Sequence, residues 1–276
     1  DSGTGNLRIL AENFQVRNSG NSSTMIFATP GDSVQLYHNN ATKLETASTG
    51  VDVTGNLTAT GTVSGASALS HRNLIINGAM RVAQRGDVTG ITSTSYGGPD
   101  RFSLGLGSAG TWTAAQSTDA PVGFSNSYKL DCTTADASLG GTDLLVFQQG
   151  IEGQNLQHLK KGTSSAESVT VCFYVKSNKT GTYIAELFDL DNSRQISQAY
   201  TISSANTWEK KTLTYAGDTS GALDNDNAAS LFLVCWLAAG STYSSGTLST
   251  TWTSQTAANR AVGQVNLADS TDNDWS

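Results

Sequence analysis

Apolar and polar residues alternate along most of this chain, in short runs that Gly, Asn, Asp and Ser interrupt. Such alternation is typical of strands that bury one face, and the interrupting residues favour turns. Only residues 152–161 have helical spacing, with Leu156 and Leu159 on one face. Regularly spaced short strands predict an all-β sandwich or jelly roll. The candidate strands of this domain are 101–106, 111–116, 127–132, 142–151, 167–177, 182–189, 194–202, 208–216, 229–238 and 259–268.

Two of these candidate strands, 167–177 and 229–238, are fairly apolar on both faces. A strand inside a two-layer sandwich needs only one apolar face. We therefore expect the second face to be covered as well, by a subunit or by a ligand. In the first strand one face carries Val169, Val171, Phe173 and Val175, and the other carries Thr170, Cys172 and Tyr174.

Residues 1–70 form shorter runs, at 6–16, 24–28, 33–39, 42–47 and 50–65, each with one thin apolar row. Small isolated sheets are marginal in water, so these rows need a partner. The alternatives are disorder, because the stretch is rich in Ser, Thr and Gly, and burial against copies of the same segment. The recurring apolar faces favour the second, and an intertwined parallel trimer suits a long thin shaft. Directly after it, 74–76 is a candidate strand followed by an Asn77-Gly78 turn.

Composition divides the chain at the same place. All five Trp and all three Cys lie beyond residue 110, so a large core belongs to the second part. We therefore predict two domains, a trimeric β shaft over 1–70 and a β-sandwich or jelly-roll domain over 71–276. Only 14% of the residues are charged, against roughly 25% in an average soluble protein.

Charge, hydropathy and cysteine content argue against several classes of protein. The net charge of −7 disfavours nucleic-acid binding, which needs a basic face. No apolar run is long enough to cross a membrane as a helix. Three cysteines without a C-x-x-C motif indicate neither a disulfide framework nor a zinc site.

No pattern of catalytic residues stands out. The three histidines, His38, His71 and His158, are not in any nucleophile or metal motif. Most acidic residues fall in turn-like stretches. Among them Asp224 and Asp226 resemble a calcium loop but lack its central Gly and later Glu. They are either part of a solvated turn or ligands of a structural calcium ion, and we expect no other cofactor.

Aromatic residues in polar loops are the candidates for sugar binding, because their rings stack on the apolar face of a pyranose. Residues 240–260 form a long polar excursion that carries Tyr243 and Trp252. Trp112 and Tyr96 are weaker candidates. The alternative is that these rings fold back onto the sandwich or into a subunit contact. Trp208 and Trp236 are expected in the core, because they lie inside candidate strands.

Two kinds of resemblance can be read from ordered motifs. NLIINGAM (73–80) and NTWEKKTLTY (206–215) resemble strands of carbohydrate-binding jelly-roll modules, although Ala79-Met80-Arg81 replaces the aromatic-acid pair of those modules. The longer series NLIINGAMRVAQRG, PDRF, FQQGIEGQNLQHL, AESVTVCFYVKSNKTGTY, NTWEKKTLTYAGDTSGAL and AAGSTYSSGT is similar to the tips of bacteriophage tail fibres. Residues 1–70 are similar to the shafts that precede such tips.

The resemblance implies a non-enzymatic, homotrimeric tail fibre protein of the virion that attaches to a host cell-surface polysaccharide and to other tail proteins. It transfers no catalytic residues. Two alternatives stay open, a tailspike-like depolymerase and a purely structural fibre segment. Because jelly-roll modules usually end on a further apolar strand and this chain begins at Asp1 rather than Met, we also expect the natural protein to extend beyond both ends of this chain, which is expected to stop in an acidic turn at Ser276.

Overall fold

The computed structural model describes residues 11–56 and 73–276. The chain divides into two units, Asp1–Ala66 and Ser67–Ser276. The sequence places the division after residue 70, and both positions fall among residues 57–72, outside the described residues. Each unit is an antiparallel all-β structure, which confirms the predicted class.

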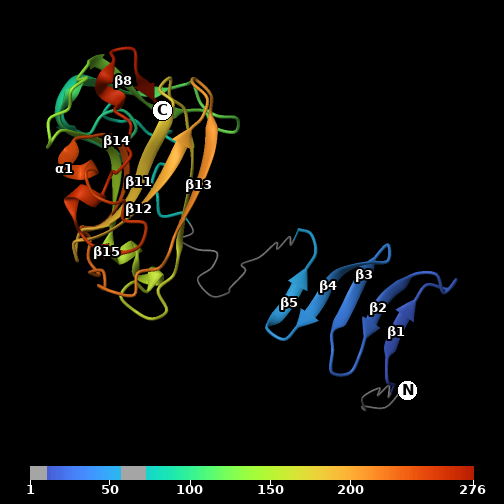
Figure 1. Cartoon of the computed structure of the whole chain (residues 1–276). Coiled ribbons are helices and arrows are strands. Elements are labelled where there is room, and N and C mark those ends of the chain that lie inside the picture. The colour runs from blue at the N-terminus through green and yellow to red at the C-terminus, as the bar shows by residue number, and fades with distance from the viewer. Residues whose placement is uncertain (1–10, 57–72) are drawn as a thin grey trace. The chain divides into compact units, whose positions relative to one another are not determined.

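The N-terminal unit is a five-stranded antiparallel meander in which each strand pairs with its neighbour in the chain (Figure 1). Gly50 has a φ of 152°, in a region that favours glycine, where the chain turns into the last strand. All the described pairing lies within one chain, and the predicted intertwined trimer stays a prediction. The strands are β1 (Phe14–Arg17), β2 (Thr24–Ala28), β3 (Val34–His38), β4 (Ala41–Ala47) and β5 (Gly50–Val53).

One face of this five-stranded sheet is apolar. A row crosses all five strands through directly paired residues, Val16, Ile26, Leu36, Leu44 and Val53. The opposite face carries the paired row Gln15, Phe27, Gln35, Glu45 and Asp52, which is mainly polar. The apolar face is open to solvent in the single chain, because Leu36 and Val53 are each 41% exposed.

The C-terminal unit contains a nine-stranded antiparallel sheet and a second sheet of two strands. Eight strands of the large sheet follow the order β15-β12-β11-β14-β9-β7-β8-β16, and β6 pairs with β7. The layers are therefore unequal, unlike an even jelly roll. The large sheet comprises β6 (Val88–Ser95), β7 (Ser103–Ser117), β8 (Ser127–Thr134), β9 (Leu144–Glu152), β11 (Gly181–Asp189), β12 (Arg194–Ile202), β14 (Ala229–Ala239), β15 (Thr253–Ser254) and β16 (Asp274–Trp275), and the small one β10 (Val169–Val175) and β13 (Glu209–Tyr215).

The main core lies between the two sheets. The Phe173 ring of β10 packs edge-on against Tyr200 of β12, with ring centres 5.2 Å apart. The Tyr215 hydroxyl of β13 donates a hydrogen bond to the Ala185 carbonyl of β11 at 3.0 Å. Burial of these large rings removes much apolar surface from water, and this burial is the main stabilising contribution to the domain.

The other face of the large sheet is covered by the chain itself. Val146, Ile184, Val234 and Trp236 form a second buried cluster there, and residues of the 240–261 segment pack on it. This segment includes the short helix α1 (Ser241–Ser244) (Figure 1). The expected cover for strand 229–238 is therefore neither a subunit nor a ligand. The outer face of β10, in contrast, is exposed at Tyr174.

Several predicted elements are different in the structure. Candidate strands 101–106 and 111–116 are one long strand, β7, because a register shift at Gly107–Ser108 and a Gly110 φ of 80° bend it without ending it. Residues 259–268 form turns, including η3 (Ala257–Asn259) and η4 (Leu267–Asp269), instead of a strand. The predicted helix is two 3₁₀ turns, η1 (Gly153–Asn155) and η2 (Gln157–Leu159), although Leu156 and Leu159 are both buried as expected.

Residues 74–76 are also not a strand. The side chain of Gln149 takes the place of a neighbouring strand there, because its amide accepts from the Ile76 N–H at 2.8 Å and donates to the Ile76 carbonyl at 2.9 Å. The Asn77 turn is present, with φ at 60°. The chain ends on β16, where Trp275 is buried, and not in an acidic turn. No helix of the described residues is long and apolar enough to cross a bilayer.

Candidate functional site

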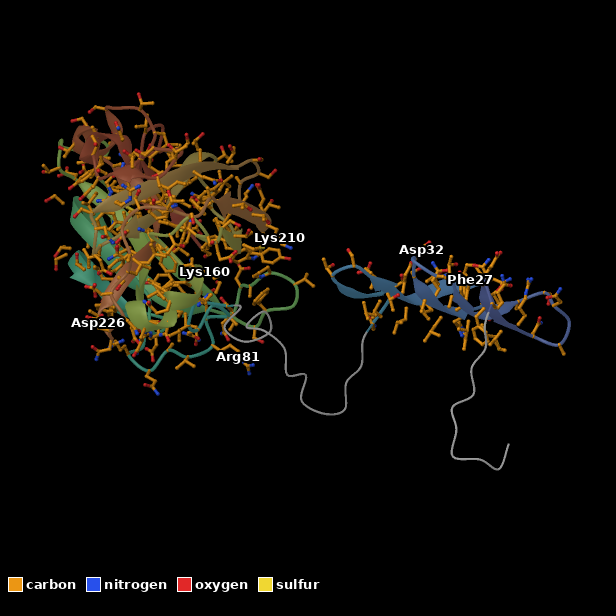
Figure 2. The ribbon with its side chains drawn as sticks, turned by 90° about the horizontal axis from the view of Figure 1, so that it is seen from below. Phe27, Asp32, Arg81, Lys160, Lys210 and Asp226 are labelled. Carbon is orange, nitrogen blue, oxygen red and sulfur yellow. The ribbon has the colours of Figure 1, made fainter. Side chains whose placement is uncertain are left out.

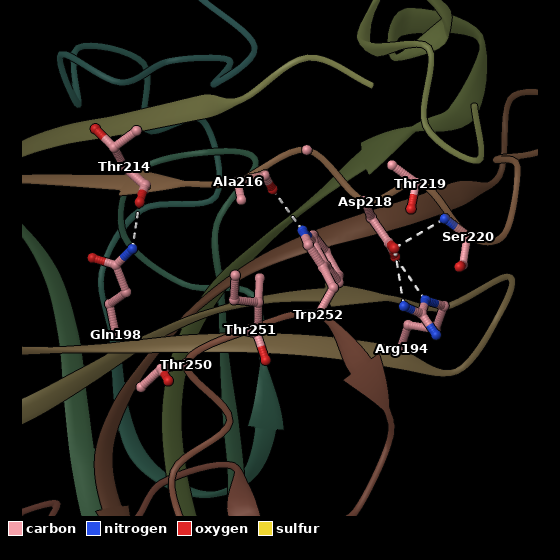
Figure 3. Close-up of a pocket in the computed structure, with 12 residues that line it drawn as sticks. Arg194, Gln198, Thr214, Ala216, Asp218, Thr219, Ser220, Thr250, Thr251 and Trp252 are labelled. Carbon is pink, nitrogen blue, oxygen red and sulfur yellow. Dashed lines mark hydrogen bonds and ion pairs between the residues drawn. The ribbon is translucent and has the colours of Figure 1, made fainter. Parts of the chain in front are cut away.

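A cleft of about 440 Å³ opens where β12 and β13, from different sheets, lie next to each other. Alternate residues of β12, Arg194, Ile196 and Gln198, line one side. The end of β13 and the loop 216–220 line another side, and residues 250–252 complete the cleft (Figure 3). The 240–260 excursion, where the sequence predicts a binding loop, thus contributes to this cleft.

Trp252 is the aromatic residue of the cleft. Its indole N–H donates a hydrogen bond to the Ala216 carbonyl at 2.7 Å, which fixes the ring against the loop after β13 (Figure 3). The Lys161 ammonium lies 5.2 Å from the ring centre, in cation–π geometry. The ring is half-buried, so it is held in position while part of it still lines the cleft.

A buried ionic network supports the cleft floor. Arg194 binds Asp218 through two hydrogen bonds, of 2.6 Å from Nε and 2.9 Å from Nη2. The Lys161 Nζ lies 2.5 Å from Asp189 Oδ2 and 3.1 Å from Asp218 Oδ2. Two cations and two carboxylates balance, and every buried charge has a partner, as buried charges require. The network ties β11, β12 and the loop after β13 together beneath Trp252.

Asp218, the carboxylate of this network that lines the cleft, is unsuited to acid catalysis. Burial alone would raise the pKa of Asp218, but hydrogen bonds from Arg194, the Ser220 backbone and Lys161 outweigh it, so the pKa lies below its ordinary value. A general acid of a glycosidase needs a raised pKa and a second carboxyl group across the cleft. Among the described residues that line this cleft, Asp218 is the only carboxylate.

Hydroxyl groups line the rest of the cleft. No hydrogen bond within residues 11–56 and 73–276 holds the side chains of Thr219, Thr250 and Thr251, so these hydroxyls can exchange water for a ligand. The Gln198 amide is already engaged, because its Nε2 donates to the Thr214 carbonyl. A fixed indole ring beside free hydroxyls and a guanidinium can bind a polyhydroxylated ligand through stacking and hydrogen bonds.

The structure places three of the four aromatic candidates in different surroundings, and the fourth, Tyr96, lies outside this cleft. Trp252 lines the cleft, as described above. Tyr243 lies on α1 with its ring 5.3 Å from that of Trp236, so it folds back onto the second buried cluster. Trp112 is fully buried, and its indole N–H donates to the Ala109 carbonyl at 2.7 Å. Trp112 is therefore corrected from a binding candidate to a core residue, because no glycan can reach its ring.

Trp208 and Trp236, both expected in the core, differ in burial. Trp236 is buried as expected, and its indole N–H donates to Glu186 at 2.9 Å. Trp208 precedes β13 and is only partly buried, with its indole N–H donating to Asp119 at 3.1 Å. The expectation that Trp208 lies in the core is therefore corrected, because its ring packs under the Lys176 ammonium at the surface.

The two calcium candidates lie in an exposed turn before β14. Asp226 projects from the surface of the C-terminal unit (Figure 2), and its Oδ1 accepts a hydrogen bond from the Ala228 backbone at 2.9 Å. The Asp224 backbone N–H donates to Asp191 at 2.9 Å. Among the described residues no group of three or more potential ligands forms a metal site. The geometry of these two residues is that of a turn.

Sequence reasoning missed the ionic residues of the cleft. Asp218 stands in a Gly-Asp-Thr-Ser-Gly stretch that reads as a simple turn, and Arg194 begins an ordinary strand. Nothing in the spacing links them to Lys161, which precedes Asp218 by more than fifty residues. The low charge of the chain is the one usable signal. In a protein with few charged residues, lysine, arginine and aspartate are expected to form ion pairs even when they lie far apart in the sequence.

The chain was compared with protein families, curated proteins and solved structures. No protein-family model and no curated protein sequence matches the chain. Among solved structures, the enzymatically active domain of tailspike protein 4 from bacteriophage CBA120 is similar, with a TM-score of 0.34 and 20% identity. The similarity covers 50% of this chain and 17% of that one.

Proposed function

We propose that this chain is the receptor-binding end of a phage tail fibre, which attaches the virion to a host surface glycan without cleaving it. The observation that carries the proposal is the Trp252 cleft. It combines a fixed aromatic ring, Arg194 and free threonine hydroxyls on a rigid β scaffold. Sugar recognition needs this combination of a stacking surface and hydrogen-bonding groups. The order of the sequence motifs supplies the phage context.

Homotrimer formation belongs to the same proposal. Single sugar contacts of this shallow kind are weak, and three linked clefts would gain strength by avidity. The exposed apolar face of the N-terminal sheet gives a reason for association, because such a face is unfavourable in water. Other tail proteins of the virion would hold the fibre at its opposite end.

The test is binding of the purified full chain to an array of purified bacterial capsular polysaccharides and O-antigens. Trp252→Ala should weaken binding about ten-fold, the loss typical of an aromatic contact that contributes above 1 kcal/mol. Trp252→Phe should retain part of the affinity, because a ring remains. Trp208→Ala is the matched control, since it removes a partly exposed tryptophan that does not line the cleft. Thermal unfolding should show that each variant is folded.

The other outcomes identify the alternatives. Release of new reducing ends from a bound polysaccharide would replace the proposal with a depolymerase. Absence of binding to every polysaccharide of the array would favour a structural fibre segment. Equal loss in Trp252→Ala and Trp208→Ala would place the binding surface away from the cleft.

A further inference from the structure

A second and larger cleft, of about 650 Å³, lies elsewhere on the C-terminal unit and shares no lining residue with the first. It is built where the loop before β6, the start of β7 and the paired ends of β9 and β14 meet. Its lining consists of Gln84, Arg85, Tyr96, Asp100, Arg101, Gly150, Glu152, Asn227, Ala229 and Phe232.

Two aromatic rings contribute to this cleft. Tyr96, directly after β6, is 56% exposed. The Arg85 guanidinium lies 5.4 Å from its ring centre. The Phe232 ring lies across Gly150 of the paired strand, where a methyl group would come within 3.0 Å of a ring carbon. Gly150 thus lets an aromatic surface lie flat against β9.

Asp100 is the most informative polar group. Its backbone is fixed, since its N–H donates to the Val82 carbonyl at 2.8 Å and its carbonyl accepts from Asn77 Nδ2 at 3.0 Å. Its Oδ1 is buried and has no hydrogen-bond partner among the described residues. Buried carboxylate oxygens are nearly always satisfied, so this carboxylate has hydrogen-bonding capacity that the described residues leave unused.

The remaining charges of the cleft are loosely held. Arg101 Nη2 lies 3.6 Å from Glu152 Oε1, which is longer than a hydrogen bond. The other Glu152 oxygen accepts from Gln154 at 3.0 Å and from Asn155 at 3.3 Å. Two arginines and two carboxylates leave the cleft without net charge. A neutral ligand with several hydroxyl groups matches this set better than an anion or a cation does.

We infer that this cleft is a second saccharide site, which takes a neutral hexose unit. One sugar hydroxyl donates to the Asp100 carboxylate, which lines the cleft, and Arg101 donates to a ring or hydroxyl oxygen. The apolar face of the sugar packs on Tyr96. This inference rests on the proposed glycan-binding function, but its residues are separate from those of the Trp252 cleft, so the two can fail independently.

The experiment is an NMR titration of the isotope-labelled full chain with galactose, glucose and mannose, and with glucuronate as the charged comparison. Backbone amide signals around 94–101 and 227–232 report the second cleft, and the Trp252 indole signal reports the first. We expect saturable changes around the second cleft with at least one neutral hexose. Tyr96→Ala and Asp100→Ala should each weaken that binding at least ten-fold.

Two controls separate binding from general disturbance. Tyr174→Ala removes another exposed tyrosine, on the outer face of β10 and outside both clefts, and should leave the titration unchanged. Trp252→Ala should also leave the second-cleft signals unchanged. A response at the Trp252 indole without any saturable change around 94–101 would overturn the second site and leave the proposed function in place. Changes that persist in folded Tyr96→Ala and Asp100→Ala variants, or that occur with glucuronate alone, would overturn it as well.

Discussion

At the scale of single residues, aromatic side chains differ in whether a ligand can reach them. Trp112, Tyr243 and Trp252 are all aromatics with polar neighbours in sequence, yet only Trp252 lines a cleft. Trp112 is buried in the core and Tyr243 packs on Trp236, whereas Trp252 is held beside the buried Lys161 network. Lys161 is nearly inaccessible, and both its carboxylate partners are buried too. Such a network is compatible with a stable fold only when it is complete, because the loss of one partner leaves a buried charge unpaired.

Because of this network, the free energy of unfolding should depend on pH in the acidic range. The pKa of Asp218 is lower in the folded chain than its ordinary value of 3.8, so its contribution is fully present above that value and is lost as the pH falls through the folded pKa. Urea unfolding should give a free energy that declines below about pH 4, and Asp218→Asn should make this decline shallower. Lys161→Met should cost about 3–5 kcal/mol at neutral pH, because it leaves the buried Asp189 carboxylate without its cation, whereas Asp218 keeps Arg194. The same acid decline in Asp218→Asn as in the parent would contradict this assignment.

At the scale of elements, the sequence predicts most strands of the C-terminal domain because alternation and turn residues are local signals. Candidate strand 194–202 coincides with β12, and 127–132 lies within β8. The misses have non-local causes. Residues 259–268 have the alternating pattern of a strand. In the structure, however, the Gln264 side chain accepts a hydrogen bond from the Ile184 N–H at 2.8 Å. This segment therefore binds to β11 through a side chain and does not form a strand itself. The ionic cleft depends on long-range pairing that no local pattern records.

Gln149 gives a test of such side-chain attachment. Gln149→Leu should leave the Ile76 N–H and carbonyl without their partner and destabilise the chain by about 1 kcal/mol. Hydrogen exchange of the Ile76 amide should accelerate, because nothing else in the described structure holds it. Gln148→Leu, on the opposite side of β9, is the matched control. Unchanged exchange at Ile76 in Gln149→Leu would show that the turn alone holds this segment.

At the scale of the whole molecule, the two units bury apolar surface to very different degrees. The C-terminal unit covers both faces of its large sheet, and the N-terminal sheet has one layer with five apolar residues in register on an open face. A single layer of this kind requires a partner. Copies of the same chain are always available, and the apolar row carries no charge that would oppose their contact.

Association should therefore depend on that face. Sedimentation equilibrium of the full chain should give three times the 28.8 kDa chain mass. The double variant Leu36→Lys with Val53→Lys should dissociate, because it places charges in the buried rows. Asp52→Lys, on the polar face next to Val53, is the control and should remain associated. A monomeric parent chain whose N-terminal sheet is still formed would contradict the trimer.

The three cysteines differ in burial and therefore in the reactivity of their thiols. Burial raises the pKa of Cys235 to about 12 and also raises that of Cys132, which keeps both as protonated, poorly reactive thiols. Cys172 is the exposed one, on the outer face of β10, which neither cleft includes. A maleimide dye should therefore attach at one position per chain without touching either cleft. Stepwise photobleaching of single labelled particles would then count the chains in each particle directly.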